Sequence, residues 1–190
     1  MRKLIVSEFV SVDGVMEAPG GEQGYQHSGW VMAFPQDPGQ TKYKLDEVLD
    51  AEALLLGRVT YEGFAAAWPS RTDDAGFADK MNRMPKYVVS TTLGEPEWNN
   101  STVIGDDIAA RVAELKTAHD GDILVNGSGQ LVRLLVDDGL IDELRLMVFP
   151  ILLGAGRRLF EDGAAAPLQL VESKPVGSDG VVILTYRPAD

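Results

Sequence analysis

The chain contains no cysteine and only two histidines among its 190 residues. The lack of cysteine excludes disulfide bonds, thiolate metal sites and cysteine nucleophiles, and it favours an intracellular protein, which we expect to be cytoplasmic. His27 and His119 lie far apart in the sequence, and neither has a second ligand residue of the usual spacing beside it. A zinc site or a Ser-His-Asp triad therefore has little support.

Basic residues and long apolar runs are also scarce. The chain carries 17 Lys and Arg against 29 Asp and Glu, a net charge of −12, which repels a phosphate backbone and argues against a nucleic-acid partner. The first apolar stretch is interrupted by Ser7 and Glu8 and lacks a small-residue cleavage site. Since no other run could cross a bilayer, we expect no membrane partner.

Apolar, β-branched runs alternate with helical patterns along the chain. Such runs predict strands at residues 3–10, 53–57, 86–91 and 122–126. Helical spacing of apolar residues predicts helices at 41–51, 58–68, 107–119 and 128–138. Three further strands, at 141–154, 168–176 and 180–188, have only short links, which predicts an antiparallel edge beside a parallel centre. Without a repeat or a linker, residues 1–190 are predicted to form one α/β domain with a mixed central sheet flanked by helices.

The stretch "DILVNGSGQL" joins a predicted strand to a predicted helix. Gly127 and Gly129 would let backbone N–H groups approach an anion at the positive end of that helix, although two glycines also make an ordinary tight turn. A Rossmann fingerprint would need glycine in place of Val132, and a P-loop would need a Gly-Lys pair that the sequence lacks. A nucleophile elbow would need glycines two residues before and two residues after Ser128, and neither position holds one.

Two other strand ends carry residues suited to phosphate. In "LLLGRVTYEGF", Gly57 allows close approach, Arg58 supplies a planar cation and Thr60 supplies a hydroxyl at a helix start. In "VVSTTL", Ser90 and Thr91 could bind a further phosphate. The alternative for the first motif is a capped helix with a solvent-facing arginine. The alternative for the second is that Ser and Thr are ordinary turn residues. Three such strand ends in one sheet predict a crevice for an extended diphosphate ligand.

Five motifs span nearly the whole chain, namely "SVDG", "LLLGRVTYEGF", "VVSTTL", "VNGSGQLVRLL" and "FPILLGAGRRLF". In this order they resemble the dihydrofolate reductase-like superfamily, and more closely the C-terminal reductase domain of riboflavin biosynthesis. The resemblance implies a dihydrofolate reductase-like three-layer fold, NADPH as cofactor and a small heterocyclic substrate. It also implies cofactor contacts, with Arg58 and Thr60 on the adenosine-side phosphates, Ser90 and Thr91 at the 2′-phosphate, and Gly127, Ser128, Gly129, Gln130 and Leu131 at the diphosphate.

The same resemblance suggests residues for the substrate half of the site. Asp13, in "SVDG", lies where the family lines its active site beside the nicotinamide, although an Asp-Gly turn is an equal alternative. We place Trp30 near the site as a second catalytic residue, although aromatic residues near loops often serve as core anchors. Arg157 and Arg158 offer the positive charge that a ribityl-phosphate substrate needs, and a solvated turn would also explain them. Asp37 is the nearest acid to the folate pattern, but its spacing from Trp30 departs from it.

These features favour an NADPH-dependent reductase similar to 5-amino-6-(5-phosphoribosylamino)uracil reductase. A dihydrofolate or other pterin reductase is one alternative. A protein that binds NADPH without turnover is another, because the sequence offers no unambiguous proton donor. We also expect the stretch 14–29, with its five glycines, to act as a mobile lid. The apolar strands 144–153 and 181–186 are expected to present edges that a monomer would leave exposed, which predicts a homodimer.

Overall fold

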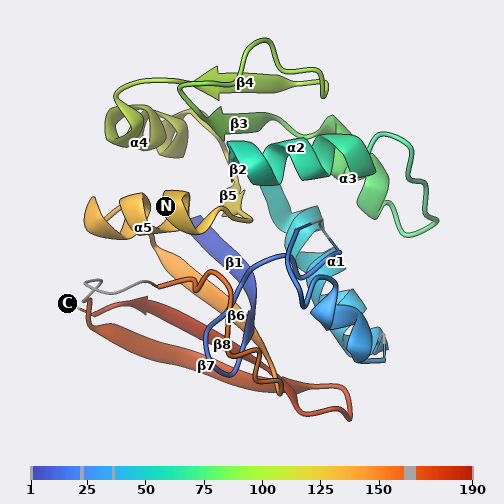
Figure 1. Cartoon of the computed structure of the whole chain (residues 1–190). Helices are drawn as coiled ribbons and strands as arrows, with labels where there is room; N and C mark the ends of the chain where they lie inside the picture. The colour runs from blue at the N-terminus through green and yellow to red at the C-terminus, as the bar shows by residue number, and fades with distance from the viewer. Residues whose placement is uncertain (1, 22–23, 36, 161–165, 190) are drawn as a thin grey trace.

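An eight-stranded mixed sheet forms the centre of the protein in this computed structural model, which describes residues 2–21, 24–35, 37–160 and 166–189 (Figure 1). The strands are β1 (Leu4–Ser11), β2 (Ala51–Gly57), β3 (Lys86–Val89), β4 (Ser101–Ile104), β5 (Asp122–Val125), β6 (Glu143–Phe149), β7 (Leu168–Val176) and β8 (Val181–Pro188). The helices are η1 (Trp30–Ala33), α1 (Pro38–Asp50), α2 (Arg58–Ala67), α3 (Phe77–Arg83), α4 (Ile108–Ala118) and α5 (Gly129–Asp137). None of the helices in these ranges is long and apolar enough to span a bilayer.

The strand order is β4-β3-β2-β5-β1-β6-β8-β7. The first six strands of this order pair in parallel, while β8 pairs antiparallel with both β6 and β7. The predicted antiparallel edge beside a parallel centre is therefore confirmed. The β7–β8 pair follows from the short link between Val176 and Val181, because only an antiparallel pair can be joined by a tight turn. The link from β6 to β7, from Phe149 to Leu168, is longer than predicted.

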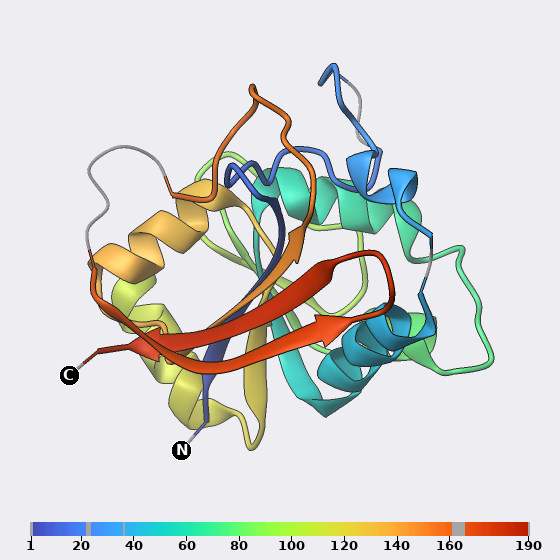
Figure 2. The ribbon, with the colours of Figure 1, turned by 90° about the horizontal axis from the view of Figure 1, so that it is seen from below.

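Helices cover both faces of the sheet (Figure 2). On one face α4 and α5 pack on a core that includes Leu4, Val6 and Leu135. On the other face α1, α2 and α3 pack on a core that includes Leu54 and Leu56. The α/β prediction with helices flanking a mixed sheet is thus confirmed.

Two short elements, α3 and β4, were not predicted from the sequence. Both are too short for a clear apolar period, since α3 has seven residues and β4 has four. The start of α1 also differs from the prediction, because the helix begins at Pro38 rather than at residue 41. Asp37 caps it by accepting the Gly39 N–H at 2.6 Å, so this acid begins a helix and does not lie within one.

The loop that follows β1 is fixed at both of its ends. Val15 is 1 % exposed and forms an isolated bridge with Arg158. Trp30 is 4 % exposed and packs edge to face on Phe149, with ring centroids 5.5 Å apart. Residues 22–23 of the predicted lid lie outside the described residues. The lid's mobility stays a prediction, and any movement would be confined to the part of the loop between these two anchors.

Candidate active site

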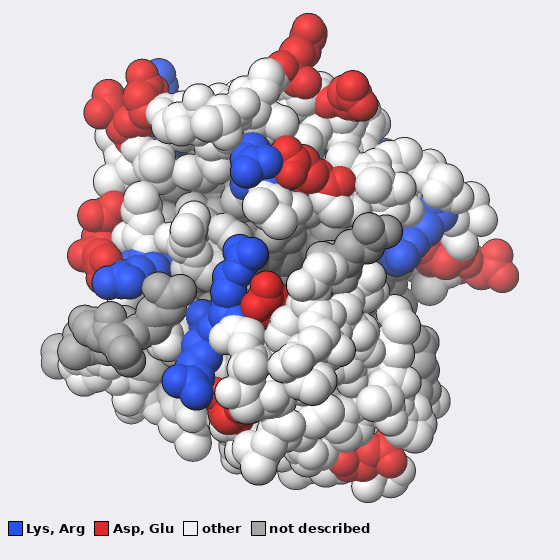
Figure 3. Space-filling model, viewed as in Figure 1, with Lys and Arg blue, Asp and Glu red and all other residues white. Residues whose placement is uncertain are grey.

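The three predicted strand ends lie at one edge of the sheet. β3, β2 and β5 are neighbours and run in parallel, so the residues after them, Ser90, Gly57 and Gly127, emerge side by side. The chain leaves β2 toward α2 on one face and leaves β5 toward α5 on the other face. Ligands of α/β sheets bind where the connections that follow two neighbouring strands lead to opposite faces of the sheet. Figure 3 shows the surface hollowed at its centre, with Lys and Arg atoms on both sides of the hollow.

The glycine turns after β2 and β5 are in direct contact. The Gly57 N–H donates to the Gly127 carbonyl at 3.2 Å. A Cβ added at Gly127 would lie 2.6 Å from the Thr60 hydroxyl oxygen, and one added at Gly57 would collide with the Ser128 hydroxyl. Gly127 also has a φ of 68°, which favours glycine. Packing between the turns therefore requires both glycines.

Two helices begin at these turns without a side-chain cap. The N-cap of α2 is Gly57, which has no side chain, and the N-cap of α5 is Ser128, whose hydroxyl makes no capping hydrogen bond. The first turn of a helix presents backbone N–H groups and a partial positive charge. Two such helix starts, held together by the glycine turns, suit an anion with two linked phosphates.

Arg58, Ser90 and Thr91 border this pair of turns. Arg58 forms an ion pair with Glu62 at 2.8 Å, and its side chain is 42 % exposed, so it can exchange this partner for a phosphate. The Ser90 hydroxyl accepts the N–H groups of Thr92 and Leu93, so in this structure it closes its own turn. Thr91 beside it is exposed.

Asp13 fastens two loops to each other. Its carboxylate accepts the Ser11 hydroxyl at 2.6 Å and the backbone N–H groups of Leu153 at 3.2 Å and Gly154 at 2.8 Å. These hydrogen bonds, with that of Ser11 the largest, lower the pKa of Asp13 to about 2. Asp13 is therefore ionised at neutral pH and is suited to holding the 153–154 turn rather than to donating a proton.

Trp30 and Arg157 both form hydrogen bonds with Glu17. The indole N–H of Trp30 donates to the Glu17 carbonyl at 2.8 Å. The Glu17 carboxylate accepts the Arg157 backbone N–H at 2.7 Å and lies 3.4 Å from the Arg157 guanidinium. Trp30 thus ties the β1 loop to the core, and the charge of Arg157 is partly offset by Glu17.

Arg158 lies beside the first turns of α5. It lines a cavity of about 450 Å³ along α5 together with Gly129, Gln130 and Arg133. A Cβ at Gly129 would lie 3.1 Å from the Met16 sulfur and 3.6 Å from the Arg158 carbonyl. The loops after β1 and β6 therefore both reach the turn after β5.

Sequence reasoning missed Glu8, which lies on β1 beneath the turn after β5. Glu8 is 9 % exposed, and its Oε1 accepts the Gly127 N–H. Burial raises the pKa of Glu8 to about 8. The signal in the sequence is the alternation in β1, because Glu8 shares a strand face with the buried residues Val6 and Val10.

A second buried polar group, also missed, lies on the opposite face of β1. The Ser7 hydroxyl donates to Glu47 at 2.8 Å and accepts from Lys44 at 2.8 Å. Lys44 and Glu47 form an ion pair, and Arg145 lies 3.3 Å from the other Glu47 oxygen. Asn126, which precedes the glycine turn, donates to the Ser7 carbonyl at 2.8 Å.

Across the described part of the chain, no group of three His, Asp or Glu could hold a metal ion.

Comparisons with known proteins agree with this fold. Residues 2–182 match the RibD C-terminal domain family. The uncharacterized protein YyaP of Bacillus subtilis (strain 168) is 30% identical over 190 residues, covering 98% of this chain and 95% of YyaP. A crystal structure from Shewanella sp. PV-4, assigned provisionally to riboflavin biosynthesis, superposes with a TM-score of 0.74 at 21% identity and 99% coverage of both chains.

Dihydrofolate reductase from Enterococcus faecalis, complexed with NADP(H) and RAB-propyl, superposes with a TM-score of 0.64 at 14% identity, covering 99% of this chain and 97% of that one. At this identity the likeness concerns the fold alone, and it confirms the dihydrofolate reductase-like architecture predicted from the motifs. The match over residues 2–182 covers every strand end discussed above. The chain belongs to the RibD C-terminal domain family, and its fold is dihydrofolate reductase-like.

Proposed function

We propose that this protein is an NADPH-dependent reductase of a small heterocyclic substrate, similar in its reaction to 5-amino-6-(5-phosphoribosylamino)uracil reductase. One observation carries the proposal: two glycine turns, joined by the hydrogen bond from Gly57 to Gly127, bring the starts of α2 and α5 together at the strand ends. The Enterococcus dihydrofolate reductase, which has the same fold, is complexed with NADP(H), and this supports the choice of cofactor.

We assign each part of the dinucleotide to one of the strand ends. We call residues 127–131 the cofactor turn, and we assign the diphosphate to its backbone N–H groups and to the start of α5. Arg58 and Thr60 would hold phosphate oxygens on the adenosine side, and Ser90 and Thr91 would hold the 2′-phosphate. Arg58 is exposed enough to pair with that phosphate as well. Bound NADPH would supply the hydride, and the protein would position the substrate and exclude water.

The loop after β1 would form the substrate half of the site. Asp13 holds this loop to the 153–154 turn, and Trp30 anchors its far end in the core. Arg158 is placed to receive an anionic group of substrate or cofactor next to the start of α5. Because Asp13 is ionised, we assign it the positioning of this loop and not the transfer of a proton.

The test is a cofactor titration followed by a turnover assay. NADPH fluorescence should change on binding to the protein at micromolar concentration, and NADPH absorbance should then fall with one member of a panel of aminouracils, pteridines and folates. Turnover of a folate or pterin alone would favour the pterin reductase alternative. Binding without turnover of any compound would favour a nucleotide-binding protein without catalysis, and the absence of binding would contradict the proposal.

A homodimer is a second part of the proposal. The stretches 144–153 and 181–186 do not form the apolar edges predicted from the sequence, because β6 pairs with β1 and β8, and β8 pairs with β6 and β7. Three apolar residues of the edge strand β7 are exposed in the single chain, namely Leu168 (42 %), Leu170 (51 %) and Val171 (55 %). An edge strand with exposed apolar residues is a surface that another chain can cover. Sedimentation at micromolar concentration should show a dimer, and a purely monomeric boundary would contradict this assignment.

A further inference from the structure

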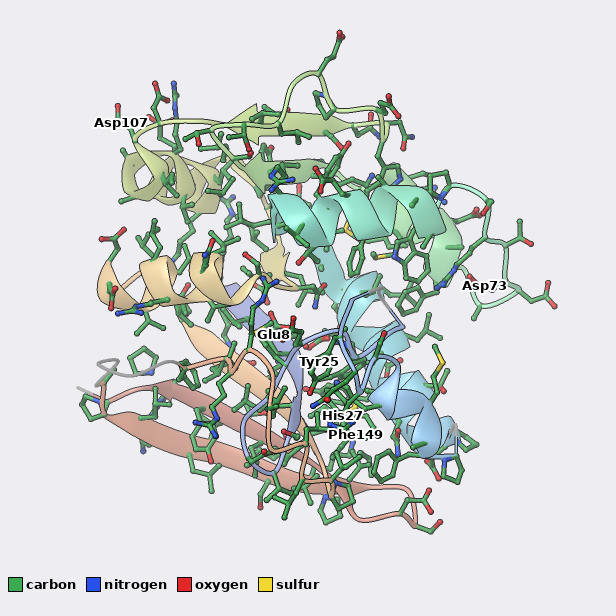
Figure 4. The ribbon with its side chains drawn as sticks, in the orientation of Figure 1. Glu8, Tyr25, His27, Asp73, Asp107 and Phe149 are labelled. Atoms are coloured by element: carbon green, nitrogen blue, oxygen red, sulfur yellow. The ribbon has the colours of Figure 1, made fainter. Side chains whose placement is uncertain are left out.

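A buried carboxyl group supports the turn to which the diphosphate is assigned. Glu8 lies on β1 between α5 and α1, at the centre of the molecule (Figure 4). Its side chain points to the α5 face of the sheet, where its β1 neighbours Val6 and Val10 join the apolar core. Nothing in the proposed reaction uses Glu8, although an ionisable group in such a position is costly unless it is neutral or paired.

A short chain of hydrogen bonds connects Glu8 to both glycine turns. Glu8 Oε1 accepts the Gly127 N–H, and the Gly127 carbonyl accepts the Gly57 N–H at 3.2 Å. Gly127 also lies against the Thr60 hydroxyl. The position of Gly127 between Glu8 and α2 therefore fixes how the starts of α2 and α5 approach each other.

Few charges act on Glu8 from its surroundings. The cofactor turn above it, residues 127–131, contains no ionisable side chain. Burial raises the pKa of Glu8 most, and the hydrogen bond from the Gly127 N–H lowers it next. From α1, Lys44 lowers this pKa and Glu47 raises it, and both effects are smaller. Lys44 and Glu47 form an ion pair with each other, and Arg145 of β6 also pairs with Glu47.

The other cations near the turn have acidic partners or lie beyond it. Arg58 of α2 pairs with Glu62, Arg133 of α5 pairs with Asp137 at 4.0 Å, and Arg157 pairs with Glu17. Arg158 lines the cavity outside α5. None of these contacts joins a cation to Glu8 within the described residues, so a negative charge on Glu8 would act mainly on the turn itself.

We propose that Glu8 is a positioning residue for the cofactor turn: its side chain oxygen holds the Gly127 N–H in either form, its neutral form leaves the diphosphate free to bind, and its ionised form opposes binding through its negative charge. This inference rests on the proposed function. Burial raises the pKa of Glu8 to about 8, so the neutral form predominates at pH 7 and the ionised form above pH 8. A carboxylate beneath a diphosphate in a poorly solvated position is repelled far more strongly than one in water.

The experiment measures the affinity of the full chain for NADPH at constant ionic strength from about pH 6.5 to about pH 9.5. The affinity of the parent protein should fall about ten-fold between pH 7 and pH 9, as a group with a pKa near 8 loses its proton. Glu8→Gln keeps an oxygen acceptor for Gly127 and cannot ionise, so its affinity should stay constant over this range.

Glu52→Gln is the matched control. The Glu52 carboxylate accepts the Gly121 N–H at the opposite end of β5, and its side chain is 39 % exposed. The hydrogen bond from Gly121 lowers the pKa of Glu52, so this group is ionised throughout the range. The control should therefore show the same ten-fold fall as the parent protein.

A second measurement uses the parent protein alone, in case Glu8→Gln fails to fold. If neutral Glu8 favours the cofactor, then the cofactor must raise the pKa of Glu8 in return. Calorimetry at about pH 8 in two buffers of different ionisation enthalpy should show proton uptake on NADPH binding. Constant affinity of the parent protein, an equal fall in Glu8→Gln, or absence of proton uptake would overturn the inference and leave the proposed function standing. Absence of NADPH binding at every pH would overturn both.

Discussion

Asp13 and Gly154 are joined by a 2.8 Å hydrogen bond, in which the carboxylate of the β1 loop accepts the backbone N–H of the loop after β6. The two residues are 141 positions apart in the sequence. Together with the Leu153 N–H, this contact makes Asp13 the link between the two loops that border the candidate substrate half of the site.

Asp13→Asn should lower the melting temperature, because the amide keeps only one acceptor oxygen for the hydroxyl and the two N–H groups. A loss of about 2–4 °C corresponds to about one hydrogen bond in a chain of this size. The pKa of Asp13 falls from 3.8 to about 2 on folding, so its ionised form stabilises the protein above pH 3.8 and this contribution is lost as pH falls through 2. Melting curves of both proteins at pH 7 and near pH 2 test this, and an equal gap at both pH values would contradict it.

Glu8→Gln should change how stability depends on pH, with or without cofactor. Folding raises the pKa of Glu8 from 4.5 to about 8, so the stability associated with its proton is complete below pH 4.5 and is lost as pH rises through 8. This pKa shift can lower the free energy of unfolding by at most on the order of 3–5 kcal/mol as pH rises. Urea unfolding between pH 5 and pH 9 should show a decline in the parent protein that is much smaller in Glu8→Gln. Parallel profiles for the two proteins would exclude the raised pKa.

The segments that the sequence predicted well are those with a clear period. The strand and helix around the glycine turn, β5 and α5, were predicted almost to the residue, because an apolar run and an amphipathic helix meet at Gly127 and Gly129. That the three strand ends share one edge also followed from the parallel strands between helices.

The contacts that depend on strand order could not be predicted. Glu8 meets Gly127 only because β5, the fifth strand of the chain, is inserted between β2 and β1. Lys86 is another example, since it is fully buried and its ammonium group donates to the carbonyls of Asn82, Met84 and Asn99. Those acceptors come from segments without a clear period, so the sequence pattern gives no sign that a lysine can be buried there.

The proposed lid should lose mobility when ligands bind. Residues 14–29 contain Val15, which is buried, but most of the described residues from Gly20 to Ser28 are exposed. Amide hydrogen exchange in residues 20–29 should therefore be fast in the free protein and slower with NADPH and substrate, because the loop orders over the site. Protection that does not change on addition of both ligands would remove the lid role.

Gly129→Val should abolish NADPH binding while the protein stays folded. A Cβ at this position already approaches the Met16 sulfur at 3.1 Å and the Arg158 carbonyl at 3.6 Å, so a branched side chain would occupy the start of α5 where the diphosphate is assigned. The atoms nearest to this Cβ belong to Met16, Arg158 and Leu159 and not to the sheet, so circular dichroism should match the parent protein. Gly63→Val is the control, because a Cβ there meets nothing within 4 Å and the residue has no positive φ, so cofactor affinity should stay unchanged. Affinity of Gly129→Val equal to that of the parent would contradict the placement of the diphosphate.

Arg58→Ala tests which cofactor the site prefers. Arg58 lies at the start of α2, its side chain is 42 % exposed, and its partner Glu62 lies one helical turn away. If the guanidinium pairs with the 2′-phosphate, the variant should lose about 1.5–3 kcal/mol of NADPH binding, or roughly ten- to hundred-fold in affinity. NADH lacks that phosphate, so its affinity should change by much less, and the ratio of the two affinities is the quantity to measure. Glu62→Ala is the matched control, because it releases Arg58 from its ion pair and should leave NADPH binding equal or tighter. Equal losses of NADPH and NADH affinity in Arg58→Ala would assign the arginine to the diphosphate, and unchanged affinity for both would show that it is only a solvated side chain paired with Glu62.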